Sequence, residues 1–526
     1  MSAHDYIIVG SGINSLVCAA MLAKRGRRVL VVERNDRIGG CLRSEELIAP
    51  GFKHDVMASW FPLFVTSPAY AQLGKDLLAH GAEFVSVEYP TASVLPNNEA
   101  FVLTTNRERN IAAMNARCPG DGDAYRAALG GIEASAELTF AMLGRQLRTF
   151  GVAKLFGKLL WRSGLTGLIR FIGDALPSCR TWLMNDIRDP ATQACLVAWV
   201  LHIGLNPESA LSGQMAKIVA LTLESVGMPV VRGGNQVLLD AFENFIVARG
   251  GKIEVSLDVD EVLVDKRGKA SGVRMVNGDT RMALQGVICS VTPTQLYQRL
   301  LRNVPLPAAV KEDASRYQYG LGDMQIHLAL NEPPKWVNSA LSKVGIVHVT
   351  SGIDSVSRAV NEGTRGLLPC ESTIVVGQPS VVDPTRAPAG SSILWLQILD
   401  VPRRIMGDAK EEIATPENGE WTQLIGDQYA DRIIALLKRH ISNLDTATIG
   451  RKVLTPTDLA ALNINLVGGD PYGGSCGLEQ SFLWRPGATS KNNNTPVESL
   501  YHIGSSTHPG PGLGGTSGFL VAEQLT

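Results

Sequence analysis

The first 33 residues contain the pattern that most restricts the fold of this chain. An apolar run at 6–9 leads into a glycine-rich turn, a helix-like stretch follows at 16–24, and a second apolar run ends at Glu33. Strand, helix and strand in this order predict a parallel β-α-β unit. The turn reads Gly10-Ser11-Gly12-Ile13-Asn14-Ser15, which matches the first two glycines of the dinucleotide-binding fingerprint and has serine at the third.

This turn predicts a site for a pyrophosphate. Gly10 permits the tight turn, Gly12 lets the backbone approach the phosphates, and the helix N-terminus offers unpaired N–H groups. Ser15 is small enough to keep helix and strand close. Glu33 stands where it accepts hydrogen bonds from a ribose, and its charge disfavours a 2′-phosphate. The alternative is a tight β-α-β turn that binds nothing.

A second glycine pair follows, in Arg34-Asn-Asp-Arg-Ile-Gly39-Gly40-Cys41-Leu-Arg43. A plain NAD-binding domain does not need this pair. Here the sequence resembles the flavoproteins of the glutathione-reductase-like superfamily. More narrowly, it resembles the phytoene-dehydrogenase-related group, which contains the carotenoid desaturases and the pyridine-nucleotide-disulphide-oxidoreductase-domain 2 proteins.

Later segments carry the same resemblance over nearly the whole chain. They are Gly233-Gly234-Asn235, Asp258-Val259-Asp260, the stretch 377–390 with Asp383-Pro384, and the stretch 468–510 with Arg485-Pro486 and Gly504-Ser505. Each is a loose match, but all occur in the order that the family has.

The resemblance implies FAD as the cofactor and a set of residues that bind it. They are Gly10, Ser11, Gly12, Asn14, Ser15, Glu33, Arg34, Gly39, Gly40, Cys41, Arg43, Ser59, Val259, Gly504, Ser505, Leu513, Gly514 and Thr516. Many relatives carry arginine directly after the glycine pair, where this chain has Cys41, so we expect Arg43 to supply the charge near the phosphates. The turn 510–515 is expected to place helix-start N–H groups against the flavin.

The expected fold class is α/β, with a glutathione-reductase-like Rossmann FAD-binding domain and an inserted α+β substrate domain. The FAD-binding domain is expected to comprise 1–70, 225–295 and 490–526. The substrate domain would then comprise 71–224, as a helical part, and 296–489.

Composition limits the function classes. The 49 Lys and Arg balance 50 Asp and Glu, so no global positive field favours nucleic acid. The eight cysteines form no CxxC pair, and no ligand spacing indicates a metal site. The N-terminus has no room for a signal peptide and no run is long enough to span a membrane, which predicts a cytoplasmic protein.

The stretch 143–172 has six basic residues and no acidic one, interleaved with large apolar side chains. A basic amphipathic helix is typical of proteins that lie on anionic membranes. Contact with the inner face of a membrane is therefore one hypothesis. The other is an ordinary helix pair that caps the substrate domain.

The leading functional hypothesis is an FAD-dependent dehydrogenase, oxidase or desaturase that removes hydride from a small hydrophobic substrate. The chain offers no second β-α-β unit after 510–515 for a nicotinamide cofactor, so oxygen or a quinone is the expected electron acceptor. His508 and Glu479 are the candidate proton-transfer groups. The alternatives are a redox-neutral polyene isomerase, a flavin-bound scaffold without activity and, as the weakest, an NAD-only dehydrogenase.

Overall fold

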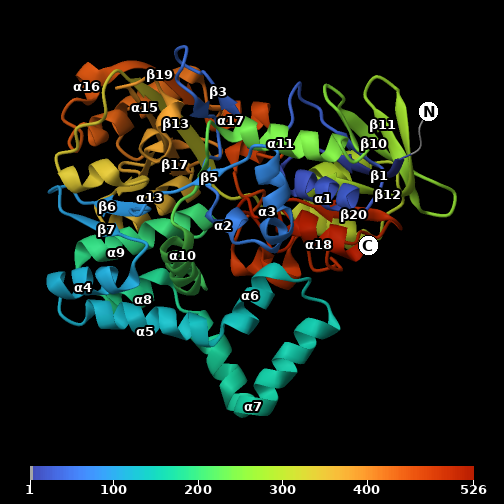
Figure 1. The fold of residues 1–526 in the computed structure, drawn as a ribbon, viewed down its shortest axis with the longest axis horizontal. Helices are drawn as coiled ribbons and strands as arrows, with labels where there is room; N and C mark the ends of the chain where they lie inside the picture. Colours follow the sequence, from blue (N-terminus) through green and yellow to red (C-terminus); the bar gives the residue numbers. More distant parts are fainter. Residues whose placement is uncertain (1–3) are drawn as a thin grey trace.

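The computed structural model describes residues 4–526, which are organised by two seven-stranded sheets at opposite ends of the long axis (Figure 1). Residues 1–3 belong to the stretch from which we argued against a signal peptide, and they lie outside the described part. The first sheet has the order β10-β11-β12-β1-β2-β9, with β20 also paired to β12. Its strands are β1 (His4–Val9), β2 (Val29–Val32), β9 (Lys252–Glu254), β10 (Val259–Val264), β11 (Ala270–Met275), β12 (Thr280–Ser290) and β20 (Leu500–Ile503).

The predicted β-α-β unit is the centre of the first sheet. It consists of β1, α1 (Ile13–Lys24) and β2, and β1 pairs in parallel with both β2 and β12. Tyr6 and Ile8 pack into the core under α1, whereas Ile7 and Val9 pack into the core on the other face. Because both faces are covered, β1 from Tyr6 onward and all of β2 are apolar, as expected for a buried parallel sheet.

The strands of the first sheet come from 4–32, 252–290 and 500–503. These ranges fall inside the three segments that we predicted for the FAD-binding domain. The exact domain boundaries stay a prediction.

The second sheet has the order β19-β13-β17-β16-β14-β6-β7, which is mostly antiparallel. Its strands are β6 (Thr91–Val94), β7 (Ala100–Leu103), β13 (Gly322–Leu330), β14 (Ile346–Val349), β16 (Ile374–Gly377), β17 (Ser392–Val401) and β19 (Thr448–Leu454). Both predicted parts of the substrate domain contribute strands to it. One face packs against α4, α5 and α8 to α10, and the other against α15.

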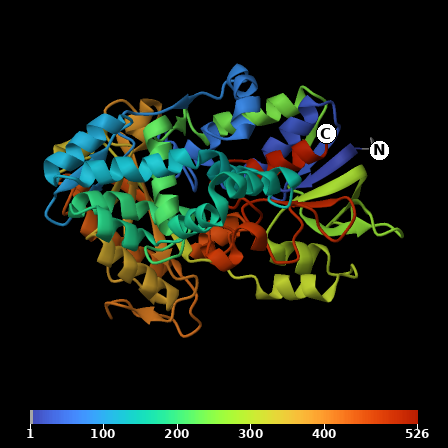
Figure 2. The ribbon, with the colours of Figure 1, turned by 90° about the horizontal axis from the view of Figure 1, so that it is seen from below.

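The remaining elements cover these sheets or join them (Figures 1 and 2). The helices are α2 (Pro62–Val65), α3 (Pro68–Ala79), α4 (Arg107–Arg117), α5 (Asp121–Ala134), α6 (Ala136–Gly144), α7 (Phe150–Ala175), α8 (Cys179–Asp186), α9 (Pro190–Val197), α10 (Ser212–Val226), α11 (Asn235–Val247), α12 (Ala308–Arg316), α13 (Ile353–Thr364), α14 (Pro379–Val382), α15 (Gln423–Leu437), α16 (Leu444–Ala447), α17 (Pro456–Leu462) and α18 (Thr516–Gln524). Short strand pairs join β3 (Ser44–Glu45) to β4 (His54–Asp55), β5 (Phe84–Val85) to β8 (Val230–Val231), and β15 (Leu367–Leu368) to β18 (Gly407–Asp408).

The helix α7 forms an arm that projects from the body as a V (Figure 1). Its bend is at Gly164, which has a φ of +66° inside the helix. Among the described residues of α7, Val152 alone is buried, so tertiary packing does not explain its many apolar side chains. No helix of residues 4–526 is long and apolar enough to cross a membrane.

A buried ion cluster joins the two parts of the fold. Arg386 donates to the carboxylates of Asp55 and Asp383, and all three side chains are fully buried. Asp383 also accepts from the Gly233 N–H, and the Asn235 N–H donates to the Ser44 hydroxyl oxygen beside Asp55. Three motifs that are far apart in the sequence therefore meet at one point.

Candidate cofactor and substrate site

A cavity of about 780 Å³ begins at the carboxyl ends of β1 and β2 and extends towards α6 and α10. Ligand cavities usually measure roughly 300–1,000 Å³, and in α/β sheets they lie at this end of the strands. All three segments of the first sheet contribute to its wall.

The turn between β1 and α1 forms one end of the cavity. Gly10 has a φ of +87°, and a Cβ there would lie 3.2 Å from the Ser290 carbonyl oxygen. Gly12 is the N-cap of α1, and no described side chain caps this helix. The first N–H groups of α1 are therefore free to bind an anion in the cavity.

The second glycine pair packs directly on this turn. Gly39 and Gly40 have φ values of +119° and +62°, and a Cβ on Gly40 would lie 3.1 Å from the Gly12 Cα. The Ser11 hydroxyl accepts from the Gly39 N–H and donates to Glu33. The two glycine loops thus approach as closely as only glycine allows.

Glu33 lies at the cavity wall at the end of β2 and is 5% exposed. Its carboxylate accepts from the Ser11 N–H at 3.0 Å, the Ser11 hydroxyl at 2.6 Å and the Asn35 N–H at 2.8 Å. These bonds hold the acceptor in place before any ribose binds.

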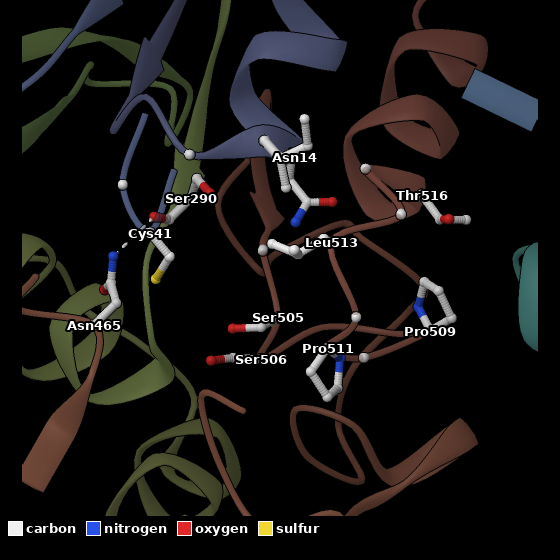
Figure 3. Close-up of a pocket in the computed structure, with 18 of the residues that line it drawn as sticks. Asn14, Cys41, Ser290, Asn465, Ser505, Ser506, Pro509, Pro511, Leu513 and Thr516 are labelled. Atoms are coloured by element: carbon white, nitrogen blue, oxygen red, sulfur yellow. Dashed lines mark hydrogen bonds between the residues drawn. The ribbon is translucent and has the colours of Figure 1, made fainter. Parts of the chain in front are cut away.

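The turn before α18 forms the facing wall (Figure 3). Gly515 is the N-cap of α18, with a φ of +66° and no described side chain capping the helix. Asn14 Oδ1 accepts from the Ser517 hydroxyl at 2.9 Å, so the starts of α1 and α18 are tied together. Leu513 and Thr516 from this turn line the same cavity as Asn14.

This donor set fits FAD. Two uncapped helix starts face one cavity, which suits a pyrophosphate at α1 and an electron-rich flavin edge at α18. Glu33 suits a ribose, and Val259 lines the wall where an adenine would lie.

Beyond these residues the cavity continues as an apolar channel. Its lining on α10 repeats every three or four residues, which places it on one helical face. The channel residues are Leu63, Thr66, Pro68, Phe140, Leu143, Ile203, Leu205, Leu211, Met215, Ile218, Val219, Leu221, Thr222 and Ser225. The hydroxyls of Thr66, Thr222 and Ser225 donate to backbone carbonyls of their own helices. None of these described residues is charged, and Cys476, which lines the cavity beside Gly204, is a thiol whose pKa burial raises to about 11.

The charged residues of the cavity wall stand outside the channel. Besides Glu33 and Arg34 they are Asp258, Arg299 and Arg485. Arg299 pairs with Asp258 at 2.9 Å, and Arg485 donates to the carbonyl oxygens of Tyr472, Ser475 and Ser505. Arg299, Asp258 and Arg485 are thus engaged by groups of the protein itself, and we give them structural roles.

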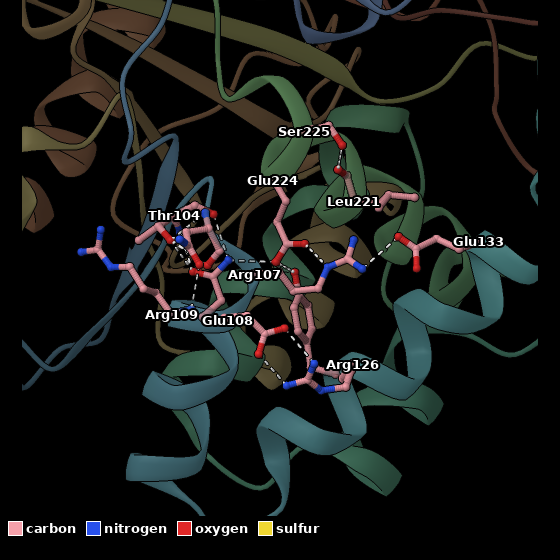
Figure 4. Close-up of polar contacts among 12 residues, drawn as sticks. Thr104, Arg107, Glu108, Arg109, Arg126, Glu133, Leu221, Glu224 and Ser225 are labelled. Atoms are coloured by element: carbon pink, nitrogen blue, oxygen red, sulfur yellow. Dashed lines mark hydrogen bonds and ion pairs between the residues drawn. The ribbon is translucent and has the colours of Figure 1, made fainter.

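A buried carboxylate fixes the helix that lines the channel (Figure 4). Glu224 of α10 accepts from Arg107 Nε, Asn110 Nδ2 and the Tyr125 hydroxyl at 2.8–2.9 Å. Arg107 also pairs with Glu133. The network ties α10 to α4 and α5, so the channel wall is held from behind.

Comparisons with known proteins agree with this geometry. Residues 8–77 match the family described as "NAD(P)-binding Rossmann-like domain". The chain is 25% identical to a phytoene desaturase (neurosporene-forming) of Rhodobacter capsulatus, over 99% of this chain and 93% of that one. It is 24% identical to the pyridine nucleotide-disulfide oxidoreductase domain-containing protein 2 of Rattus norvegicus, over 98% and 92%. An oxidoreductase from Methanosarcina mazei shares the fold, with a TM-score of 0.62, 15% identity, and 99% and 100% coverage.

The chain is an FAD-dependent oxidoreductase, and over nearly its whole length it is similar to phytoene desaturases and to the pyridine nucleotide-disulfide oxidoreductase domain-containing protein 2. Its cofactor is FAD. The α/β fold class and the flavoprotein assignment that we drew from the sequence are confirmed.

Most of the FAD-binding residues predicted for this oxidoreductase line the cavity. They are Gly10, Ser11, Gly12, Asn14, Glu33, Arg34, Gly39, Gly40, Cys41, Val259, Gly504, Ser505, Leu513, Gly514 and Thr516. Their contacts with FAD stay a prediction.

Three predicted residues lie behind the wall instead. Ser15 is fully buried in α1, where it packs the helix on the sheet. The Arg43 guanidinium pairs with Glu45, so the structure does not place its charge at the phosphates. Ser59 is buried and donates to Asp55, as part of the join between the domains.

The two predicted proton-transfer groups are also absent from the cavity wall. His508 Nε2 donates to the Arg145 carbonyl oxygen, and burial lowers the pKa of His508 to about 4. Glu479 is exposed and accepts from Ser475, and it does not pair with Arg485. The structure thus gives His508 a bracing role and leaves Glu479 at the surface.

Other wall residues of the oxidoreductase were not predicted. Ser290, Asn463 and Asn465 line the cavity, the Asn463 amide donates to the Cys41 sulfur at 3.4 Å, and the Asn465 amide donates to the Ser290 carbonyl oxygen at 3.3 Å. Asn463 and Asn465 follow α17 in a loop without a motif, so no sequence signal indicated them.

Proposed function

We propose that this protein is an FAD-dependent dehydrogenase that oxidises an elongated, uncharged apolar substrate. The apolar channel carries this proposal. Its α10 face runs from Leu211 to Ser225, about 21 Å at 1.5 Å per residue. A channel of this length whose described lining carries no charge favours a long hydrocarbon-like molecule over a small amine or acid. The Rhodobacter capsulatus relative is named for a substrate of this kind.

The residues of the chain bind and orient both molecules. Bound FAD supplies the hydride acceptor. Glu33, the start of α1 and the start of α18 hold the cofactor, while the face of α10 aligns the substrate and excludes water. Because the described channel residues include no base, the substrate's proton has to leave through polar groups at the cofactor end.

Oxygen or a quinone is the proposed electron acceptor. The turn 510–515, which formally repeats the glycine fingerprint, leads into α18 and completes the FAD cavity. It is therefore not available as a separate nicotinamide site.

Contact with a membrane surface is part of the proposal. On the arm, Phe150 is 85% exposed and Trp161 is 86% exposed, with Leu165 and Ile169 also exposed. Basic residues alternate with them, and α6, at the base of the arm, contributes Phe140 and Leu143 to the channel. Apolar insertion and attraction to anionic headgroups act together in such a surface. We propose a cytoplasmic protein that docks on the inner face of a membrane through this arm.

The test of the function is anaerobic reduction of the flavin. We expect phytoene in detergent to bleach the flavin absorption bands and a short alkylamine to leave them unchanged. Ile218→Trp should slow the bleaching by blocking the channel, while Gln214→Trp, on α10 outside the lining, should not. Conversion of a polyene without any bleaching would indicate the isomerase instead, and no reaction with any apolar substrate would refute the proposal.

The membrane contact has a separate test. The protein should sediment with vesicles that contain phosphatidylserine and not with phosphatidylcholine vesicles. Trp161→Asp should abolish sedimentation, and Met406→Asp, at an exposed apolar residue away from the arm, should retain it. Equal sedimentation of both variants would rule out the arm as the docking surface.

A further inference from the structure

One face of β13 is polar although it is buried. Met324, Ile326 and Leu328 point into the core of the second sheet. The alternate residues Asp323, Gln325 and His327 are at most 3% exposed and form what we call the polar β13 face. A strand between two layers is expected to be apolar on both sides, so this face needs a separate explanation.

The polar β13 face packs behind the glycine-pair loop of the cofactor site. His327 Nε2 donates to the Val56 carbonyl oxygen at 3.1 Å, and Trp395, opposite His327 on β17, donates to Met57. The same loop continues through hydrogen bonds from Val56 to Arg43 and from Ala58 to Cys41. Cys41 lines the cavity, so the face lies directly behind one part of the wall.

Several buried atoms of this face lack a partner. The amides of Gln325 and Gln397 both donate to Asp323 Oδ2, at 2.9 and 3.0 Å. Asp323 Oδ1 and Gln325 Oε1 then have no donor among the described residues. Each unsatisfied acceptor costs about 1–3 kcal/mol, and native structures satisfy such groups with protein or ordered water. Two acceptors two residues apart on one face fit a water molecule that donates to both.

Solvent approaches the polar β13 face at one residue. Gln397 is partly exposed, although β17 lies between β13 and β16 in the middle of the sheet. Its amide donates to Asp323 Oδ2, so this polar group links the buried carboxyl to the exposed side of Gln397.

Asp323 also interacts with the cavity wall. Burial of the Cys41 thiol raises its pKa, the Asn463 amide lowers it, and the charge of Asp323 raises it further. Its charge adds to the burial that raises the pKa of Tyr472, next to the wall residue Pro471. The polar groups that interact with Asp323 include the Cys41 and Tyr472 side chains, the neutral amides of Gln325 and Gln397, and the Met324 N–H.

We propose that Asp323 and Gln325 hold a water molecule behind Cys41, and that this water carries protons between Asp323 and the cofactor end of the cavity. Asp323 acts through the water and does not touch the substrate. Its use in turnover rests on the proposed function. Desaturation of a CH–CH unit releases one hydride to the cofactor and one proton, which passes through the water to the Asp323 carboxylate. When oxygen reoxidises the cofactor, one proton returns from Asp323 as hydrogen peroxide forms.

The titration properties of the cluster suit this role. Burial raises the pKa of Asp323 to about 7, so the carboxyl exchanges a proton near neutral pH. Burial lowers the pKa of His327 to about 4 and that of His54 to about 3, so both stay neutral. The channel itself supplies no such group.

The first experiment is a crystal structure of the holoprotein. We expect water density within about 2.7–3.2 Å of both Asp323 Oδ1 and Gln325 Oε1. A dry contact between these oxygens and the neighbouring side chains would overturn the proposal, whatever the substrate is.

The second experiment needs no substrate. The holoprotein is reduced with dithionite, mixed with oxygenated buffer, and the return of the flavin bands is timed from pH 5 to 9. The rate should fall as the pH rises through about 7, and Asp323→Asn should remove this step and slow the return at pH 6 by about tenfold or more. Asp400→Asn is the matched control. Asp400 is a buried carboxyl like Asp323, but it lies on β17 and accepts hydrogen bonds from Ser372 and Thr373.

Gln325→Leu is a second variant, which keeps the Asp323 carboxyl and removes only the neighbouring amide. It should also flatten the pH profile, since it removes one ligand of the water. An unchanged profile in both Asp323→Asn and Gln325→Leu would refute the relay, whereas failure of all apolar substrates with an intact pH step would refute only the desaturase function.

Discussion

Arg386 Nη1 lies 2.9 Å from Asp55 Oδ2, and both side chains are fully buried. Asp55 belongs to the loop after the second glycine pair, and Arg386 belongs to the segment between the β16 and β17 strands of the second sheet. The pair therefore sets the position of the cofactor loop relative to the substrate domain.

Replacing Arg386 should be strongly destabilising. Arg386→Met leaves Asp55 and Asp383 buried without their cation, which costs about 3–5 kcal/mol in comparable pairs. Urea unfolding measures the loss. Arg232→Met, which breaks an exposed pair with Glu83, should cost less than about 1 kcal/mol. Similar losses in the two variants would contradict the role that we give to burial.

Reversing the charge of Glu33 should weaken FAD retention. Glu33→Arg removes the ribose acceptor and the carboxylate that fixes Ser11, so the purified protein should contain markedly less flavin per chain. The ratio of flavin to protein absorbance measures this. Glu46→Arg, at an exposed residue, should keep the wild-type ratio, and full retention in Glu33→Arg would remove the ribose assignment.

Removing the Glu224 carboxylate should loosen the channel wall. Glu224→Ala leaves Arg107, Asn110 and the Tyr125 hydroxyl without their acceptor, at a cost of about 1–3 kcal/mol for each unsatisfied group. Thermal unfolding should show the loss, and bleaching by an apolar substrate should slow while FAD content stays constant. Parallel loss of FAD would mean that the network supports the whole fold and not the channel.

Acid should destabilise the protein through its buried histidines. Burial lowers the pKa of His348 to about 3 and that of His502 to about 4. These side chains stay neutral in the folded protein and gain protons in the unfolded chain. Their contribution to the stability of the fold is therefore fully present above pH 6.5 and is lost as the pH falls towards 3–4. The free energy of unfolding should fall by up to about 1.4 kcal/mol per pH unit for each histidine.

A variant of His502 tests whether this histidine makes the free energy of unfolding fall at low pH. His502→Gln should reduce the slope of unfolding free energy against pH between 6.5 and 4, because one protonation site is removed. Denaturant unfolding at four pH values measures both slopes. An equal or steeper slope in the variant would show that His502 is not responsible.

Local patterns predicted the cofactor end of the site well. The strand, turn and helix at 4–24 and the glycine pair at 39–40 place their residues on the cavity wall because short-range geometry alone positions them. Arg43 and His508 lie elsewhere for different reasons. Arg43 pairs with Glu45, its close neighbour in the sequence, and the sequence alone did not favour this pair over a contact with a phosphate. His508 meets Arg145 at the base of the arm, far away in the sequence, so no local pattern indicated this partner.

The apolar channel was beyond sequence analysis for a similar reason. The face of α10 repeats at helical spacing, and such a face usually packs into a core. Here it lines a cavity because α4 and α5 hold the opposite side through Glu224, and this arrangement depends on residues over 100 positions apart. The projection of α7 likewise depends on the bend at Gly164.

The placement of α18 has a consequence for how the protein is made. The walls of the cofactor cavity include Gly504 and Thr516, and β20 pairs with β12 only when residue 503 has been synthesised. A nascent chain folds from its N-terminus as it leaves the ribosome. The α1 turn therefore waits, open to water, through the synthesis of nearly the whole chain, and flavin can be enclosed only after translation has passed Thr516.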